Sequence, residues 1–145
     1  MNFLLDTVVL SEARKPLADR NVVQWLRGVP ASAAFVSVIA LSEIQRGIVM
    51  ARRRDPAFAT GLERWLAGLQ TTYADRIIDI DRAIALRWGQ IAGEVGHSTP
   101  DIAIAATAHV HRLVVATRNA DDFLRAGVPV LNPFQPSPQI IRPRV

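Results

Sequence analysis

The sequence contains no cysteine, which excludes disulfides and zinc sites built from thiolates and fits a reducing compartment. Any bound metal must therefore be held by oxygen atoms or by one of three histidines. No uncharged apolar run approaches the roughly 20 residues that span a bilayer. The N-terminus also lacks the basic flank, apolar core and small-residue cleavage site of a secretory signal. We therefore expect a soluble, cytoplasmic protein with no membrane association.

Lysine is nearly absent, since Lys15 is the only one among 17 basic residues, which face 13 acidic residues. Four of these acids, Asp6, Glu43, Asp101 and Asp122, adjoin predicted strands or helix ends. Without them the remaining charge is 17 − 9 = +8. A cationic shell around a small acidic centre suits a polyanionic substrate whose phosphates are attracted by arginine. The alternative explanation for the excess of arginine is genomic base composition.

At 145 residues the chain is long enough for one domain that buries roughly two thirds of the surface of its unfolded form. Apolar runs of strand composition alternate with helical patterns. Strands are predicted at residues 2–5, 34–38, 76–80, 113–117 and 128–131, and helices at 7–13, 21–27, from 39, 57–71, 82–95, from 100, and in a short segment ended by Gly127. This order predicts an α/β domain with a mainly parallel central sheet flanked by helices. Residues 135–145 are predicted to form an extended, proline-rich tail outside a domain of residues 1–134.

Acidic side chains occur where strands end or helices begin. Asp6 follows the first strand directly, and ligands of open α/β sheets bind outside the carboxyl ends of strands. Glu43 projects from the first turns of a helix, Asp101 lies in the first turn after Thr99, and Asp122 follows the strand at 113–117. Structural roles compete with the functional one, because Glu43 also fits a solvated helix surface and Asp101 also complements the helix dipole.

Four carboxylates at one edge of a sheet repel one another unless a cation neutralises them. Ligation by oxygen alone points to Mg²⁺, or alternatively Mn²⁺. Magnesium takes only one or two carboxylates directly, so the other acids would act through water. With a phosphodiester bound, such an ion activates a water as nucleophile and offsets charge on the leaving oxygen. His97, His109 and His111 are interpreted as loop and helix-surface residues.

An ordered set of motifs covers nearly the whole chain: Leu4-Leu-Asp6-Thr7, Ser37 with Glu43 six residues later, Asp101-Ile-Ala-Ile-Ala-Ala-Thr-Ala, Val115-Ala-Thr-Arg-Asn119-Ala-Asp-Asp122-Phe, and Asn132-Pro-Phe. This set resembles the PIN-domain ribonucleases, and among them the VapC and FitB toxins of bacterial toxin–antitoxin pairs. The resemblance implies a single PIN-like domain and a Mg²⁺-dependent endoribonuclease. It also implies a small cognate antitoxin that occupies the acidic groove and carries the DNA-binding element, so that DNA is reached only through the antitoxin.

Carried over by position, Asp6, Glu43 and Asp101 match the first three acids of that family, with Asp6 and Asp101 as the direct metal ligands. The fourth acid of the family stands either where Asn119 or where Asp122 lies here. Because only Asp122 ionises, it is taken as the fourth catalytic residue.

Three polar residues complete the predicted site. Asn119 is a supporting polar group beside the fourth acid. Thr7 and Thr117 are expected to orient water or phosphate.

Two positions depart from the pattern, since Val8 replaces an Asn and Ala40 replaces a Thr. These changes motivate an alternative function, a catalytically weak PIN-like module that binds RNA or a protein partner. A phosphatase with a phosphorylated aspartate after the first strand is disfavoured, because Val8 stands where such enzymes carry a second Asp. An apolar helical stripe that includes Phe58 and Trp65 predicts core packing or a homodimer interface.

Overall fold

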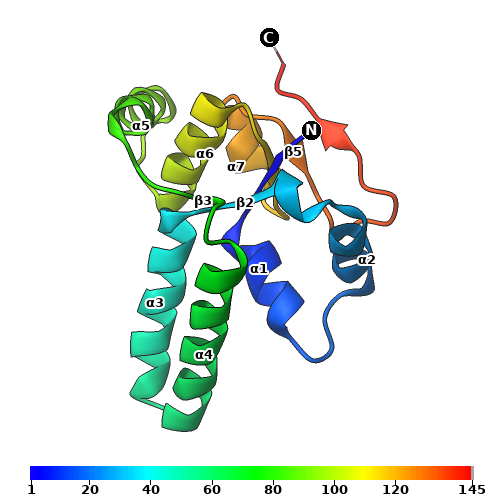
Figure 1. Ribbon diagram of the computed structural model, residues 1–145. Coiled ribbons are helices and arrows are strands. Elements are labelled where there is room, and N and C mark those ends of the chain that lie inside the picture. Colours follow the sequence, from blue (N-terminus) through cyan, green and yellow to red (C-terminus); the bar gives the residue numbers. More distant parts are fainter. Residues whose placement is uncertain (145) are drawn as a thin grey trace.

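The computed structural model of the protein describes residues 1–144 (Figure 1). Its elements follow one another as β1 (Phe3–Leu5), α1 (Thr7–Arg14), α2 (Arg20–Gly28), the 3-10 turn η1 (Ala31–Ala33), β2 (Ala34–Ser37), α3 (Val38–Arg52), α4 (Pro56–Thr72), β3 (Ile77–Ile78), α5 (Arg82–Val95), α6 (Pro100–His111), β4 (Val114–Ala116), α7 (Ala120–Arg125), β5 (Val130–Leu131) and β6 (Ile140–Ile141). This order, together with the parallel pairing of β1 to β5, confirms the α/β class with a mainly parallel sheet.

The six strands form one sheet in the order β3-β2-β1-β4-β5-β6, and only β6 runs antiparallel to its neighbour. After β1 the chain adds β2 and β3 on one side, and β4 then pairs with the other side of β1. The order of strands therefore reverses between β1 and β4. In open α/β sheets, such a reversal leaves a crevice at the carboxyl ends of the two strands, where ligands bind.

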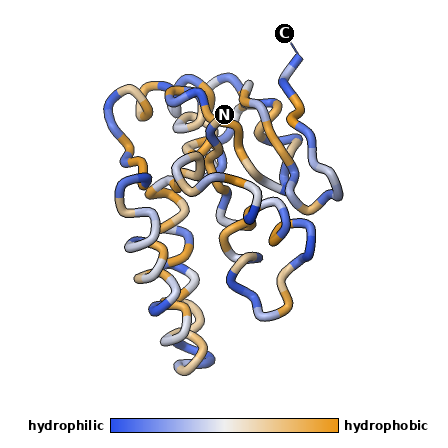
Figure 2. The backbone as a smooth tube through the Cα atoms, turned by 45° about the vertical axis from the view of Figure 1, so that its right-hand side comes forward, coloured by the Kyte–Doolittle hydropathy of each residue, from blue (hydrophilic) through white to orange (hydrophobic). Residues whose placement is uncertain are grey.

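Alternating side chains of the strands bury both faces of the sheet. Leu4 belongs to a core cluster with residues of α5, α6 and α7, whereas Leu5 belongs to a second cluster with residues of α1, α2 and α3. Val115 and Ala116 of β4 divide between the same two clusters. A strand buried on both faces loses the polar alternation of an exposed strand, which explains its continuous apolar sequence. Figure 2 shows these apolar segments in the interior of the molecule.

Carboxylate and hydroxyl side chains begin most of the helices. Asp6, Asp19, Ser37, Asp55 and Asp81 each accept a hydrogen bond from a backbone N–H in the first turn of the helix that follows. Such N-caps satisfy N–H groups that have no partner inside the helix. Two of them, Asp6 and Ser37, stand directly after strands, so the same residues end a strand and fix the direction of a helix.

Helices α3 and α4 form an antiparallel hairpin that projects from the sheet (Figure 1). Its apolar stripe packs mainly within the hairpin, where Trp65 contacts a cluster built on Ile44 and Ile48. Phe58 of the same stripe stays 44% exposed. The guanidinium of Arg14, at the end of α1, lies 5.6 Å from the ring centre of Phe58 and 5.4 Å from that of Trp65. The predicted core role of the stripe is thus confirmed for Trp65.

The structure corrects three expectations. The strands predicted at 76–80 and 128–131 shrink to two residues each, Ile77–Ile78 and Val130–Leu131. The tail supplies a further strand, β6, so β5 is not the edge of the sheet. Thr99 precedes α6 as predicted, but its side chain makes no capping hydrogen bond. Within residues 1–144, no helix combines the length and apolar character needed to cross a membrane.

Candidate active site

Asp6 stands at the carboxyl end of β1, beside the end of the neighbouring strand β4. Its backbone N–H donates to the carbonyl of Ala116 at 3.0 Å, which continues the pairing of the two strands. Its side chain turns into the structure and is only 6% exposed. The predicted anchor residue therefore lies at the switch point of the sheet.

Both carboxylate oxygens of Asp6 accept hydrogen bonds. The backbone N–H of Thr7 donates to Oδ1 at 2.8 Å, and the buried hydroxyl of Thr117 donates to Oδ2 at 2.8 Å. Burial nevertheless raises the pKa of Asp6 from 3.8 to about 6, and the charges of Asp101 and Glu43 add to this rise, while the two hydrogen bonds oppose it. Desolvation disfavours the charged form, and unbalanced negative neighbours act in the same direction.

Glu43 comes from the second turn of α3 and faces the start of α1. The hydroxyl of Thr7 donates to its Oε1 at 2.7 Å. This bond connects the helix after β1 with the helix after β2, across 36 residues of sequence. Glu43 is thereby held at the carboxyl edge of the sheet. It is therefore not the fully solvated helix residue that the sequence alone also allowed.

Asp101 and Asp122 are bridged by one amide group. The Nδ2 atom of Asn119 donates to Oδ2 of Asp101 at 3.0 Å and to Oδ2 of Asp122 at 2.9 Å. Burial raises the pKa of Asp101, and the charge of Asp122 adds to this, whereas the bond from Asn119 and the charge of His97 oppose it. Oδ1 of Asp122 also lies 3.8 Å from Nη1 of Arg125, one helical turn later. Asn119 thus donates to two carboxylates that repel each other, and its bond to Asp101 offsets part of the resulting rise in pKa.

A cavity of about 410 Å³ opens between these elements. It is lined by Asp6, Thr7, Val8, Glu43, Asp101, Arg118 and Asn119. Three of the four predicted catalytic acids therefore meet at one hollow. The fourth, Asp122, is outside the lining and reaches it only through Asn119.

The two threonines contact the acids. The hydroxyls of Thr7 and Thr117 both donate to carboxylates, although we expected them to orient water or phosphate. Thr117 also accepts from the N–H of Asn119 at 2.9 Å. These residues therefore position the acidic groups.

The two departures from the sequence pattern have different surroundings. Val8 lines the cavity, so a hydrogen-bonding group is missing from the wall itself. Ala40 is fully buried in the core beside Leu5 and Val9. Only the change at Val8 therefore alters the surface of the cavity.

The donor set of the cavity suits a hard divalent cation, because carboxylate and amide oxygens are its polar ligands. Within residues 1–144, no group of three or more His, Asp or Glu side chains has the arrangement to hold a metal ion alone. Magnesium ordinarily takes one or two carboxylates and keeps several waters, so a pair such as Asp6 and Asp101 remains compatible with it. The pKa of both residues is raised chiefly by burial, and the negative charge of neighbouring acids adds to the rise.

Arg118 is a cavity residue that sequence reasoning did not identify. It lies between Thr117 and Asn119, whose side chains both hold acids. No local sequence signal marked it, because its place in the cavity depends on the turn after β4 and on the distant residue Phe134. Its guanidinium carbon lies 4.2 Å from the ring centre of Phe134.

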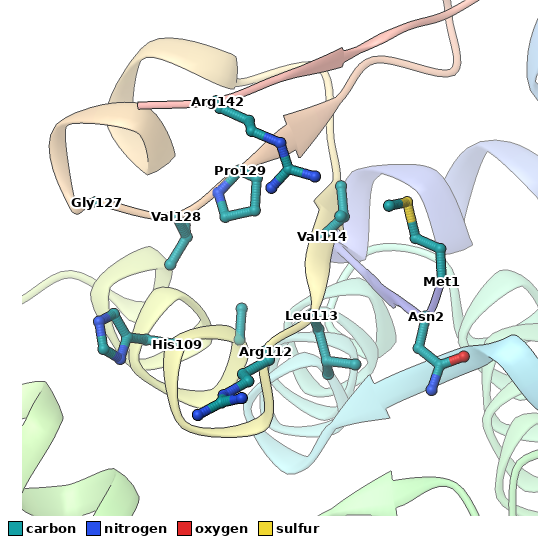
Figure 3. Close-up of a pocket in the computed structure, with 11 residues that line it drawn as sticks. Met1, Asn2, His109, Arg112, Leu113, Val114, Gly127, Val128, Pro129 and Arg142 are labelled. Atoms are coloured by element: carbon teal, nitrogen blue, oxygen red, sulfur yellow. The ribbon is translucent and has the colours of Figure 1, made fainter. Parts of the chain in front are cut away.

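A second hollow, of about 430 Å³, lies at the opposite end of the sheet (Figure 3). Its ionisable lining side chains are His109, Arg112 and Arg142, and no acidic residue contributes to it. Figure 3 shows Arg142 reaching toward Pro129 and Val114. This hollow contains two arginines and no carboxylate among the described residues, so it suits a divalent cation less well than the acidic cavity, which is the candidate active site.

Comparison with known proteins agrees with this geometry. The family model described as "PIN domain" matches residues 3–129. Toxin FitB of Neisseria gonorrhoeae is 33% identical over 138 residues, covering 90% of this chain and 97% of that protein. A protein of Sinorhizobium fredii named as a VapC ribonuclease is 29% identical over 141 residues, covering 92% and 99%. The crystal structure of FitAcB from N. gonorrhoeae aligns with a TM-score of 0.82 at 32% identity, over 92% of this chain and 99% of that one.

Proposed function

The chain belongs to the PIN-domain family, and on this basis we propose that it is the ribonuclease toxin of a toxin–antitoxin pair, a metal-dependent endonuclease that hydrolyses RNA phosphodiester bonds. Relatives named as a FitB toxin and as a VapC ribonuclease support the proposal. The observation that carries it is the meeting of Asp6, Glu43 and Asp101 at one cavity, at the switch point of the sheet.

We propose that Asp6 and Asp101 bind Mg²⁺, with Mn²⁺ as a substitute. When bound, the ion lowers the pKa of a coordinated water and offsets charge on the leaving oxygen. The protein contributes a fixed arrangement of acids. Thr117 holds the carboxylate of Asp6, and Asn119 holds that of Asp101.

Glu43 is proposed to accept a proton or to order water at the cavity, since its Oε1 is already fixed by Thr7. Asp122 is proposed as the fourth acid, acting on the cavity through the amide of Asn119.

The test is cleavage of RNA by the purified protein with Mg²⁺ or Mn²⁺, compared with Asp6→Asn and Asp101→Asn. The parent is expected to cut and both variants to lose at least about a hundredfold in rate, because one charged ligand of the ion is gone. Asp79→Asn is the matched control, since Asp79 is exposed and lies outside the cavity lining. Equal cleavage by all four proteins would indicate a contaminating nuclease and reject the site.

Metal binding has an independent readout. Titration of the protein with Mn²⁺, followed by the electron paramagnetic resonance signal of the free ion, is expected to show saturable binding in the parent and in Asp79→Asn. Binding is expected to weaken strongly in Asp6→Asn and Asp101→Asn. Equal binding by parent and site variants would show that the ion lies elsewhere.

A small cognate antitoxin is the proposed protein partner, because solved relatives include FitAB bound to DNA, with 32% identity to this chain, and a toxin–antitoxin complex of Klebsiella pneumoniae, with 30% identity. Contact with DNA is proposed to occur only through the antitoxin. A homodimer and a toxin–antitoxin hetero-oligomer are proposed as the assembly states, with the exposed Phe58 at the dimer interface.

These assemblies are tested in two experiments. Co-expression with a neighbouring reading frame of antitoxin size is expected to relieve growth arrest and to yield a co-purifying complex. Sedimentation of the isolated chain at micromolar concentration is expected to give a dimer, and a monomer there would contradict the interface.

A catalytically weak binding module is the second candidate function, and the observation in its favour is Val8 in the cavity wall. An asparagine there would add a hydrogen-bonding group beside the acids. If the parent binds RNA but cuts none, and Val8→Asn restores cleavage that depends on Asp6, the binding module is the correct description. Cleavage by the parent itself selects the nuclease.

A further inference from the structure

Among the residues 1–144 that line the acidic cavity, Arg118 is the one cation. Its neighbours in sequence, Thr117 and Asn119, are bonded to Asp6 and Asp101 respectively. The guanidinium of Arg118 instead lies over the ring of Phe134, 4.2 Å from its centre. A cation at this distance is attracted by the π-face of the ring. The ring therefore fixes Arg118 at the rim of the cavity.

Phe134 is itself held in place by the turn that follows β5. Its N–H donates to Oδ1 of Asn132 at 3.0 Å, and its carbonyl accepts from Nδ2 of Asn21 at 2.8 Å. Its ring packs against the core cluster that contains Leu5 and Val9. Two hydrogen bonds and apolar packing thus make Phe134 a rigid support for the guanidinium.

The donors of Arg118 are not used by the described part of the protein. Within residues 1–144, no carboxylate lies within 4.0 Å of its guanidinium, and its side chain donates no hydrogen bond. Arg76 provides the contrast, because it also stacks on an aromatic ring, that of Tyr73, but donates to backbone carbonyls including that of Ala34 at 3.0 Å. Arg76 therefore has a structural role. Arg118 is held over a ring but has no hydrogen-bond or ion-pair partner among residues 1–144.

The guanidinium of Arg118 is not paired with the acids of the cavity, because no carboxylate within residues 1–144 lies within 4.0 Å of it. Glu12 feels the charge of Arg118 only weakly, since the pKa of Glu12 is lowered chiefly by the N–H of Asp19 and by Lys15. A guanidinium held over an aromatic ring keeps N–H groups available for an anion.

We propose that Arg118, supported by Phe134, binds a phosphate of the RNA backbone at the rim of the acidic cavity. The inference rests on the proposed ribonuclease function and names the residue that recognises the substrate. A cavity with three carboxylates repels a polyanion, and a fixed cation beside it counteracts that repulsion. The planar fork of arginine matches two oxygens of a phosphate, and its stacked position lowers the entropy lost on binding.

The experiment measures binding of short, fluorescein-labelled, single-stranded RNA of random sequence by fluorescence anisotropy at several salt concentrations. EDTA is present, so that binding is read without hydrolysis. Arg118→Ala is expected to weaken binding about tenfold, because a charge-assisted, bidentate contact is lost. The slope of log K against log salt is expected to fall by about 0.7, the value for one phosphate contact on a single strand.

Three variants separate this role from general electrostatics. Arg142→Ala removes the same charge from the opposite end of the sheet and is expected to bind like the parent (Figure 3). Arg118→Lys keeps the charge and most of the salt slope, but loses the planar fork and gives intermediate affinity. Phe134→Leu keeps Arg118 but removes its support, and is also expected to be intermediate.

The outcomes distinguish this inference from the proposed function. If Arg118→Ala binds like the parent, or if Arg142→Ala loses as much affinity, the phosphate contact is rejected. A parent that binds RNA through Arg118 but cuts none with Mg²⁺ or Mn²⁺ rejects the nuclease and leaves the contact intact. Where the parent does cut, Arg118→Ala is expected to raise KM more than it lowers kcat, and thermal melting checks that each variant is folded.

Discussion

The hydroxyl of Thr117 donates a hydrogen bond of 2.8 Å to Oδ2 of Asp6, although 111 residues separate the two in sequence. Both side chains are almost completely buried, and each stands just after one of two adjacent parallel strands. Thr117 therefore lowers the pKa of a carboxylate that burial raises. The state of ionisation of Asp6 depends on this one hydroxyl more than on any other hydrogen bond.

Replacing Thr117 by Val is expected to shift the acid limb of the pH–rate profile for RNA cleavage to higher pH. The variant loses the hydrogen bond that favours the charged form of Asp6. The pKa of Asp6 in the metal-free variant is therefore expected to rise further above about 6. The free energy of unfolding is expected to fall by about 1–3 kcal/mol, the cost of leaving a buried group without its partner. The profile is measured with Mn²⁺ from about pH 5 upward, because a carboxyl with a pKa of about 6 titrates mostly within about one unit of that value.

Thr107→Val is the matched control. Thr107 is equally buried, but its hydroxyl donates to the carbonyl of Ala103 within α6, away from the cavity. This variant is expected to keep the pH profile of the parent. Identical profiles for Thr117→Val and the parent would contradict the assigned role of Thr117.

Asp6 is expected to make the metal-free protein less stable as pH rises. The folded chain binds the proton of Asp6 with a pKa of about 6, against 3.8 for the ordinary value, so it holds that proton more tightly than the unfolded chain does. Stability therefore falls as pH rises from about 4 to about 6, and the full penalty, about 3 kcal/mol, applies above that window. The pKa of Asp101 is raised too, which acts in the same direction.

Asp6→Asn removes this penalty and is expected to be more stable than the parent in EDTA at pH 7, by up to about 3 kcal/mol. Asparagine retains an oxygen that can cap α1, whereas Asp6→Ala loses the cap and serves as the comparison. Urea unfolding at pH 4 and at pH 7 gives the measurement. Two results together would show that the burial of Asp6 carries no such cost. The parent would be equally stable at both pH values, and Asp6→Asn would be no more stable than the parent at pH 7.

The positions of the acids could be predicted from the sequence better than the groups around them. Asp6 and Asp101 each follow a strong local signal, a strand end and a helix start, and both line the cavity, while their catalytic role stays a prediction. Arg118 was missed because its role depends on Phe134, and no local pattern shows that the two residues meet. The strand β6 was missed for a similar reason, since it pairs only two residues within a proline-rich segment.

Asp122→Asn is expected to reduce RNA cleavage less than Asp101→Asn. Asp101 lines the cavity, whereas Asp122 is connected to it through the amide of Asn119. The loss at Asp122 is expected to be about tenfold, consistent with a supporting group one contact away from the reacting atoms. The single-turnover cleavage rates of the two variants and of Asn119→Ala give the comparison. An equal loss of rate in Asp101→Asn and Asp122→Asn would instead indicate that both acids contact the reacting groups directly.

Removal of β6 is expected to destabilise the domain although the segment lies in the tail. A chain that ends at Pro136 keeps the turn from Asn132 to Phe134 but loses the antiparallel pairing of β6 with β5. The uncovered strand exposes backbone and apolar groups of Val130 and Leu131, so the free energy of unfolding is expected to fall by about 1–3 kcal/mol and association through the open edge to increase. Urea unfolding and light scattering measure both effects. A chain that ends at residue 142 retains β6 and is the control. If the two truncated chains have the same unfolding midpoint, β6 adds nothing to the stability of the domain, which then ends where the proline-rich tail begins.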